Sequence, residues 1–204
     1  MQKLNFPNNL GYRLPEPESV RELQRNAGFS NAYAHYLLTQ NGADLDLLDD
    51  YNGTHPSLVP SDTEETGPYL RTLYGLDTGE TYYDLRDCYN PGDLLAPYFF
   101  PIGEDKGGSP FVEILHGRYQ GHIASLDHNM YIGCGNPQEL ATQMEIENFG
   151  LLSLAEQTDA LCNPEIGLAW FHASTIDEFL NDCIYYDNHL NCRVLDAPSV
   201  ENIG

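Results

Sequence analysis

Basic residues are scarce in this chain. Its 204 residues include nine Lys and Arg against 31 Asp and Glu, which gives a formal net charge of −22 at pH 7. A field of that sign repels phosphate backbones and attracts basic partners, so direct binding to nucleic acid is not expected. Surface acidity also aids solubility, and charge alone does not separate the two roles.

Long apolar runs and cysteine pairs are missing as well. No eighteen consecutive residues are apolar, and the first residues do not form a basic-then-apolar export signal, so we expect a soluble, cytoplasmic protein with no membrane partner. The cysteines are odd in number and include no C-x-x-C pair, which argues against a disulfide framework and against a zinc cage. We expect reduced thiols at Cys88, Cys134, Cys162, Cys183 and Cys192.

The chain contains the beginnings of a phosphate-loop motif and of a calcium-loop motif, and both are incomplete. The glycines from Gly103 to Gly108 lack the spacing and the following Lys-Ser/Thr of a phosphate loop, so they indicate a turn. Asp44 and Asp46 start a calcium-loop pattern that Leu48 and Asp49 interrupt. We therefore expect no cofactor and no metal.

Three histidines and one cysteine are the remaining candidates for chemistry. His116, His122 and His128 recur every six residues, but the glycine after His116 breaks the strand and leaves too few ligands for zinc. Cys134, between two glycines and close in sequence to Asp127 and His128, is the best candidate nucleophile. Adjacent Asp and His in a strand point to opposite faces, so they do not easily form one relay, and we expect no enzyme activity.

The segment from Pro101 to His128 is the firmest structural prediction. Residues 111–116 alternate, with Val112 and Ile114 on one face and Phe111 and Leu115 around Glu113 on the other, as in a central strand. Gly117-Arg118 and a second extended run over residues 119–126 predict an antiparallel hairpin. We also expect extended segments at residues 70–76 and 81–85, joined by a glycine turn, an aromatic strand from Tyr98, and a strand at Trp170-Phe171.

Helix signals flank this sheet. Pro17 suits a first helical position before Gly28, and Ser30 suits the N-cap of a second helix that ends at Asn41-Gly42. Capping residues predict further helices from Asn136 toward Glu147 and from Thr175. Together these elements predict one domain over residues 1–204, an α+β fold with a mainly antiparallel sheet of about five strands covered by N-terminal and C-terminal helices.

Several short motifs occur in an order that resembles the SUKH superfamily. They are an Asn-Gly helix end, a Pro-Ile-Gly, a Gly-Gly, a glycine before a strand, an Asp-His pair and a closing Ser-containing helix. In this chain the motif residues are Asn41, Gly42, Ile102, Gly103, Gly107, Gly108, Gly121, Asp127 and His128, followed by residues 173–180. The likeness covers roughly two thirds of the chain, while residues 44–68 form an acidic insert and residues 136–168 a segment longer than the family pattern.

The resemblance implies a bacterial immunity protein, a non-enzymatic antitoxin that binds and neutralises a cognate toxin domain, commonly a nuclease. The acidic insert is then the natural binding surface for a basic partner, because it carries carboxylates without any basic residue. Its candidate partner-binding residues are Asp46, Asp49, Asp50, Glu64 and Glu65. The alternatives are an intracellular scaffold or regulatory module on the same fold and, third, a cysteine hydrolase built around Cys134.

Overall fold

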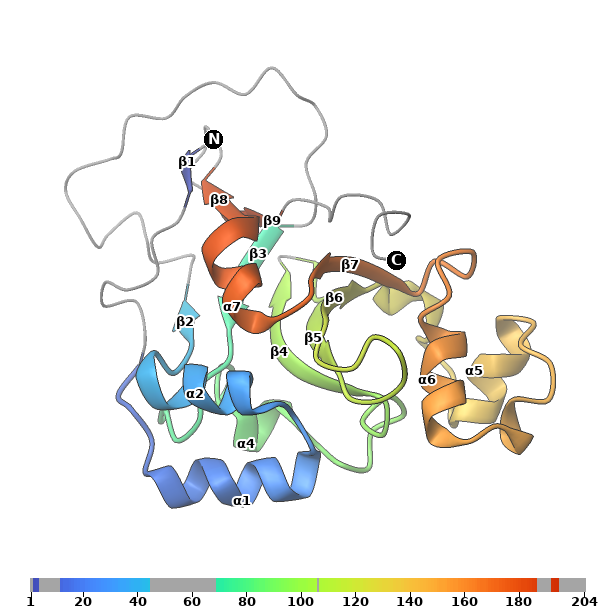
Figure 1. The fold of residues 1–204 in the computed structure, drawn as a ribbon, viewed down its shortest axis with the longest axis horizontal. Coiled ribbons are helices and arrows are strands. Elements are labelled where there is room, and N and C mark those ends of the chain that lie inside the picture. Colours follow the sequence, from blue (N-terminus) through green and yellow to red (C-terminus); the bar gives the residue numbers. More distant parts are fainter. Residues whose placement is uncertain (1, 4–11, 45–68, 106, 187–191, 195–204) are drawn as a thin grey trace.

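One antiparallel sheet runs through the computed structural model, which describes residues 2–3, 12–44, 69–105, 107–186 and 192–194 (Figure 1). The strand order is β1-β8-β9-β3-β4-β5-β6-β7, and β2 pairs with β3 beside this path. The strands are β1 (Gln2–Lys3), β2 (Ala43–Asp44), β3 (Tyr69–Leu73), β4 (Phe99–Asp105), β5 (Pro110–Ile114), β6 (Ile123–Leu126), β7 (Ala169–Ala173), β8 (Ile184–Tyr186) and β9 (Cys192–Val194). The α+β fold is confirmed, with more strands than expected because four short strands extend the five longer ones, β3 to β7.

The helices are α1 (Pro17–Ala27), α2 (Asn31–Thr39), α4 (Leu85–Cys88), α5 (Pro137–Gln143), α6 (Leu154–Leu161) and α7 (Ile176–Glu178), with the short turns η1 (His128–Met130), η2 (Phe149–Leu151) and η3 (Phe179–Cys183). Four helices begin at the predicted positions, whereas α4 and α6 were not predicted and the helix after Asn136 ends before Glu147. Gly28 ends α1 with φ 82°, and the Ser30 hydroxyl accepts the Tyr33 N–H at the start of α2. None of the helices in these described ranges is long and apolar enough to cross a membrane.

The β5–β6 hairpin is present, but its connection is longer than predicted. Residues 119–122 form turns instead of extending β6, and Gly117 and Gly121 both adopt positive φ. The Gly121 N–H donates to the Ile114 carbonyl, and the Ile114 N–H donates to the His122 carbonyl. These two bonds close the connection between the strands. The paired residues of β6 therefore begin at Ile123.

The predicted strand at residues 81–85 is wrong. This segment is a turn that leads into α4, and it meets the sheet region only at a single parallel bridge between Gly75 and Asp84. The Asp84 carboxylate accepts from the Thr78 N–H and hydroxyl and from the Arg86 N–H. An aspartate that bonds nearby backbone groups offers the chain an alternative to ladder pairing, which explains the turn.

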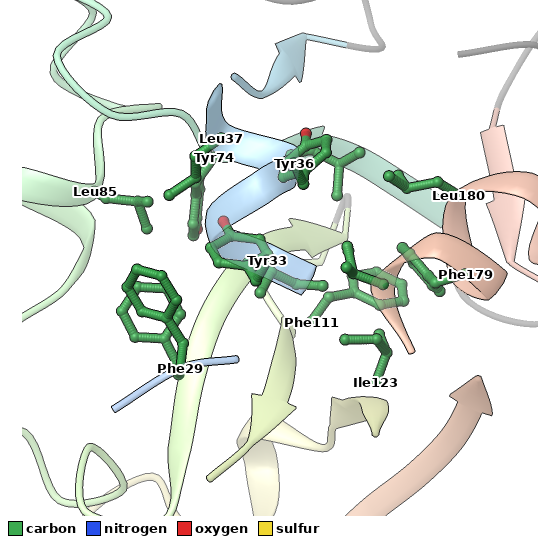
Figure 2. Packing of buried hydrophobic residues seen from close by; sticks show 14 of the residues in the cluster. Phe29, Tyr33, Tyr36, Leu37, Tyr74, Leu85, Phe111, Ile123, Phe179 and Leu180 are labelled. Carbon is green, nitrogen blue, oxygen red and sulfur yellow. The ribbon is translucent and has the colours of Figure 1, made fainter. Parts of the chain in front are cut away.

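Both faces of the sheet are buried, each against its own helices. On one face Phe100, Phe111 and Ile123 pack with side chains of α1, α2, α4 and the α7–η3 turn (Figure 2). On the other, Val112 and Ala124 pack with side chains of α5, η2 and α6. Helices from both ends of the chain therefore cover one face, as expected, and the segment at residues 136–168 supplies the cover of the opposite face.

Candidate functional site

The predicted partner-binding residues lie outside the described residues. Asp46, Asp49, Asp50, Glu64 and Glu65 all fall between residues 45 and 68. The site is therefore sought among the motif residues, the candidate nucleophile and the hollows of the described part.

The Asn41-Gly42 pair fixes the end of α2 to the segments around it. The buried Asn41 amide donates to the Arg13 and Leu76 carbonyls, and its oxygen accepts the Leu76 N–H at 2.7 Å. A Cβ on Gly42, whose φ is 82°, would lie 2.6 Å from the Gly75 nitrogen. Both residues are thus required by the packing of the chain after β3.

The glycine motif that follows Ile102 shapes the β4–β5 hairpin. Ile102 is fully buried, and a Cβ on Gly103 would collide with the Thr72 carbonyl of the neighbouring β3. In the turn, the Asp105 carboxylate accepts the N–H groups of Gly107 and Ser109, each at 2.7 Å, and Gly108 has φ 86°. These backbone donors are therefore already bonded to a carboxylate, which fits a strand-bending turn and not a phosphate cradle.

The Asp-His pair serves local structure at the end of β6. The Asp127 carboxylate accepts the Asn129 N–H at 2.9 Å and caps η1. The His128 Nδ1 lies 2.8 Å from the Ser109 hydroxyl. This hydrogen bond links the end of β6 to the β4–β5 turn, so both side chains already have structural partners.

Cys134 lies beside an amide instead of a base. Its half-buried Sγ donates to the Gln143 Oε1 at 3.3 Å. It lines an apolar groove of about 440 Å³ over β4, β5 and β6, whose other thiol is Cys88. Burial raises the pKa of Cys88 to about 11, so that thiol stays protonated at neutral pH. No cluster of three or more metal-ligating side chains occurs among the residues in the described ranges.

We expect all five cysteines to be reduced in the native protein. Cys88, Cys134, Cys162 and Cys183 form no disulfide among the described residues, and the Cys192 side chain lies beyond the described part. Titration of the unfolded chain with a thiol reagent should give five thiols, and adding a reductant should leave the melting temperature unchanged. Fewer than five thiols, together with a melting temperature that falls on reduction, would contradict this expectation.

A buried carboxylate joins the central strand to α2. Glu113 on β5 is 1% exposed, and its two oxygens accept the Ser30 N–H at 2.6 Å and the Ser30 hydroxyl at 2.9 Å. Burial raises the pKa of this carboxyl to about 7, while the bonds from Ser30 act in the opposite direction. The sequence showed only that a charge falls on an apolar face of the strand.

Two exposed glutamates line a hollow beside α5 and α6. The hollow has a volume of about 510 Å³ and is lined by Met130, Gln143, Met144, Glu145, Ile146, Ala160, Asn163, Glu165 and Ile166. Among the described residues, neither the Glu145 nor the Glu165 carboxylate has an ion pair or side-chain hydrogen bond. We call this feature the acidic hollow.

The stretch of sequence that forms the acidic hollow contains no basic residue. From Tyr119 to Cys192 the sequence has no Lys or Arg, yet it has eleven carboxylates: Asp127, Glu139, Glu145, Glu147, Glu156, Asp159, Glu165, Asp177, Glu178, Asp182 and Asp187. Outside this base-free segment, Arg21 and Arg25 pair with Glu18, Arg71 with Glu104, and Arg86 with Asp77. The gap in basic residues is the sequence signal for this surface, and it belongs to none of the short motifs.

Comparisons of the chain with known protein-family models, with curated proteins and with solved structures gave no match.

Proposed function

We propose that the protein is a non-enzymatic immunity protein of the SUKH type, which binds and neutralises a basic toxin domain, most simply a nuclease. The observation that carries the proposal is the uncompensated negative charge, −22 for the whole chain with a base-free segment of more than seventy residues. An enzyme that binds nucleic acid has Lys and Arg on the surface that contacts the phosphates. An acidic protein is complementary to that basic surface.

The motif residues support the same proposal through their structural roles. Asn41, Gly42 and Gly103 hold close approaches of the backbone, and Asp127 caps a turn. Residues that maintain a scaffold suit a protein that acts by its shape and charge. A scaffold or regulatory module would use the same features, and the identity of the captured partner separates these two functions.

The first experiment is capture of the partner from the native cells, with the tagged protein as bait. We expect a toxin domain with a basic surface, and association that slows strongly as salt rises through physiological strength, where the screening length is about 8 Å. Dissociation should change less. Recovery of a neutral or acidic partner, or association that is independent of salt, would overturn the proposal.

The acidic insert provides the corresponding variant. Replacing Asp46, Asp49, Asp50, Glu64 and Glu65 by Asn or Gln should slow association with the captured toxin and weaken protection of cells, with the fold retained. A matched control removes the same charge from exposed carboxylates near α1 and α4, at Glu16, Glu22, Glu80, Asp87 and Asp93. If both variants slow association equally, only the net charge matters and the insert is not the binding surface.

A further inference from the structure

The acidic hollow is lined by five apolar residues, by two glutamates and by two amide side chains. Met144 and Ile146 follow α5, Ile166 follows α6, and all three are only partly buried, packed against the second core cluster. Glu145 and Glu165 come from these same two connections and are exposed. Each of the two connections thus contributes one negative charge and apolar side chains to the lining of the hollow.

This arrangement complements one kind of side chain. A long cationic side chain buries its methylene stem on apolar surface and keeps its charged head at a carboxylate. Arginine suits the hollow better than lysine, because its planar guanidinium is weakly hydrated and can donate to two carboxylates at once. A volume of about 510 Å³ holds such a side chain together with part of its backbone, since ligand pockets usually span about 300 to 1,000 Å³.

The stretch of sequence that forms the hollow contains no Lys or Arg that could pair with its glutamates. The base-free segment contains every residue that lines it. The nearest preceding base in the sequence is Arg118, whose guanidinium lies over the Tyr119 ring at 4.8 Å. The charge of Glu145 and Glu165 is therefore available to a partner.

We propose that the acidic hollow receives an arginine side chain of a partner protein. This inference deepens the proposed function, because it names a docking point for the basic toxin among residues other than those of the insert at residues 45–68. It does not require catalysis or a metal.

The methionines allow a direct test without the toxin. The chain has three, Met1, Met130 and Met144, and the last two line the hollow. With ¹³C-methyl methionine, we would titrate the full-length protein with the peptide acetyl-Gly-Arg-Gly-amide and follow three methyl signals by NMR. Saturable shifts of the Met130 and Met144 signals are expected, with Met1 unmoved and the shifts reduced by added salt.

Two comparisons identify the interaction. A peptide with citrulline in place of arginine keeps the shape and loses the charge, so it should give no saturable shift at these methyls. The variant Glu145→Gln/Glu165→Gln should weaken arginine-peptide binding about threefold to tenfold, as expected for two exposed ion pairs. The control Glu16→Gln/Glu22→Gln, at the residue before α1 and within it, removes the same charge and should bind as the wild type does.

Some outcomes would overturn the inference. These are equal shifts with the citrulline peptide, unchanged affinity in the Glu145→Gln/Glu165→Gln variant, and equal weakening in the α1 control. Binding of the arginine peptide without any toxin in the capture experiment would support the hollow and refute the antitoxin role. A captured toxin that binds Glu145→Lys/Glu165→Lys as tightly as the wild type would support the role and refute the hollow as its docking point.

Discussion

Phe179→Ala should lower the free energy of unfolding by about 3 to 5 kcal/mol, as for other large-to-small changes of a buried phenylalanine. Phe179 in η3 is fully buried, and its ring centroid lies 5.7 Å from that of Phe111 on β5 and 6.3 Å from that of His172 on β7. The truncation would therefore leave a cavity between the closing helical turn and the sheet (Figure 2). Because a domain of this size is stable by roughly 5 to 15 kcal/mol, the loss is a large fraction of the total.

Chemical denaturation of the purified protein measures this effect. The control is Asp177→Asn, two positions earlier on the exposed side of α7, which should change stability by less than about 1 kcal/mol. An unaltered denaturation midpoint for Phe179→Ala would mean that this turn does not pack on the sheet in solution.

Raising the pH from about 4.5 to about 7 should remove roughly 3 kcal/mol of stability through Glu113 alone. The folded protein holds this carboxyl protonated to higher pH, since burial raises its pKa from 4.5 to about 7. Between those values the unfolded chain has lost the proton and the folded chain still carries it, so stability falls as pH rises. Each pKa unit corresponds to about 1.4 kcal/mol.

The Glu113→Gln variant isolates this contribution. Its amide can accept the Ser30 N–H and donate to the Ser30 hydroxyl, and it does not titrate. Other carboxyls, such as Glu18 and Asp77, have lowered pKa values because arginines bond to them, and these contributions cancel when the two proteins are compared. The stability of the wild type relative to the variant should fall by about 3 kcal/mol between pH 4 and pH 8. A difference that stays constant with pH would contradict the prediction.

Local signals predicted most of the elements. Pro17, Ser30 and Asn136 start helices because each satisfies or replaces backbone donors that a helix leaves unpaired, which depends on neighbours in sequence. The alternation around Glu113 also gave the two buried faces of β5 correctly. In each case the residues that determine the element lie within a few positions of it in the sequence.

Contacts between residues far apart in the sequence could not be predicted, and the acidic hollow exists because residues in and after α5 and α6 meet Met130. The turn around Asp84 depends on a nearer partner, Thr78, but the alternating pattern of residues 81–85 did not show that bond. No local pattern showed that Glu113 would bond to Ser30, 83 positions away. The partner-binding residues of the insert remain a prediction, because they lie outside the described residues.

The base-free segment has a practical consequence for mapping any complex of this protein. Trypsin cleaves after Lys and Arg, so residues 119–193 leave the digest as one long peptide. Cross-linkers that react with lysine have no lysine to react with there. Carboxyl-directed cross-linkers and a protease that cleaves after glutamate would instead label and divide this segment. Their targets include Glu145 and Glu165, which line the acidic hollow.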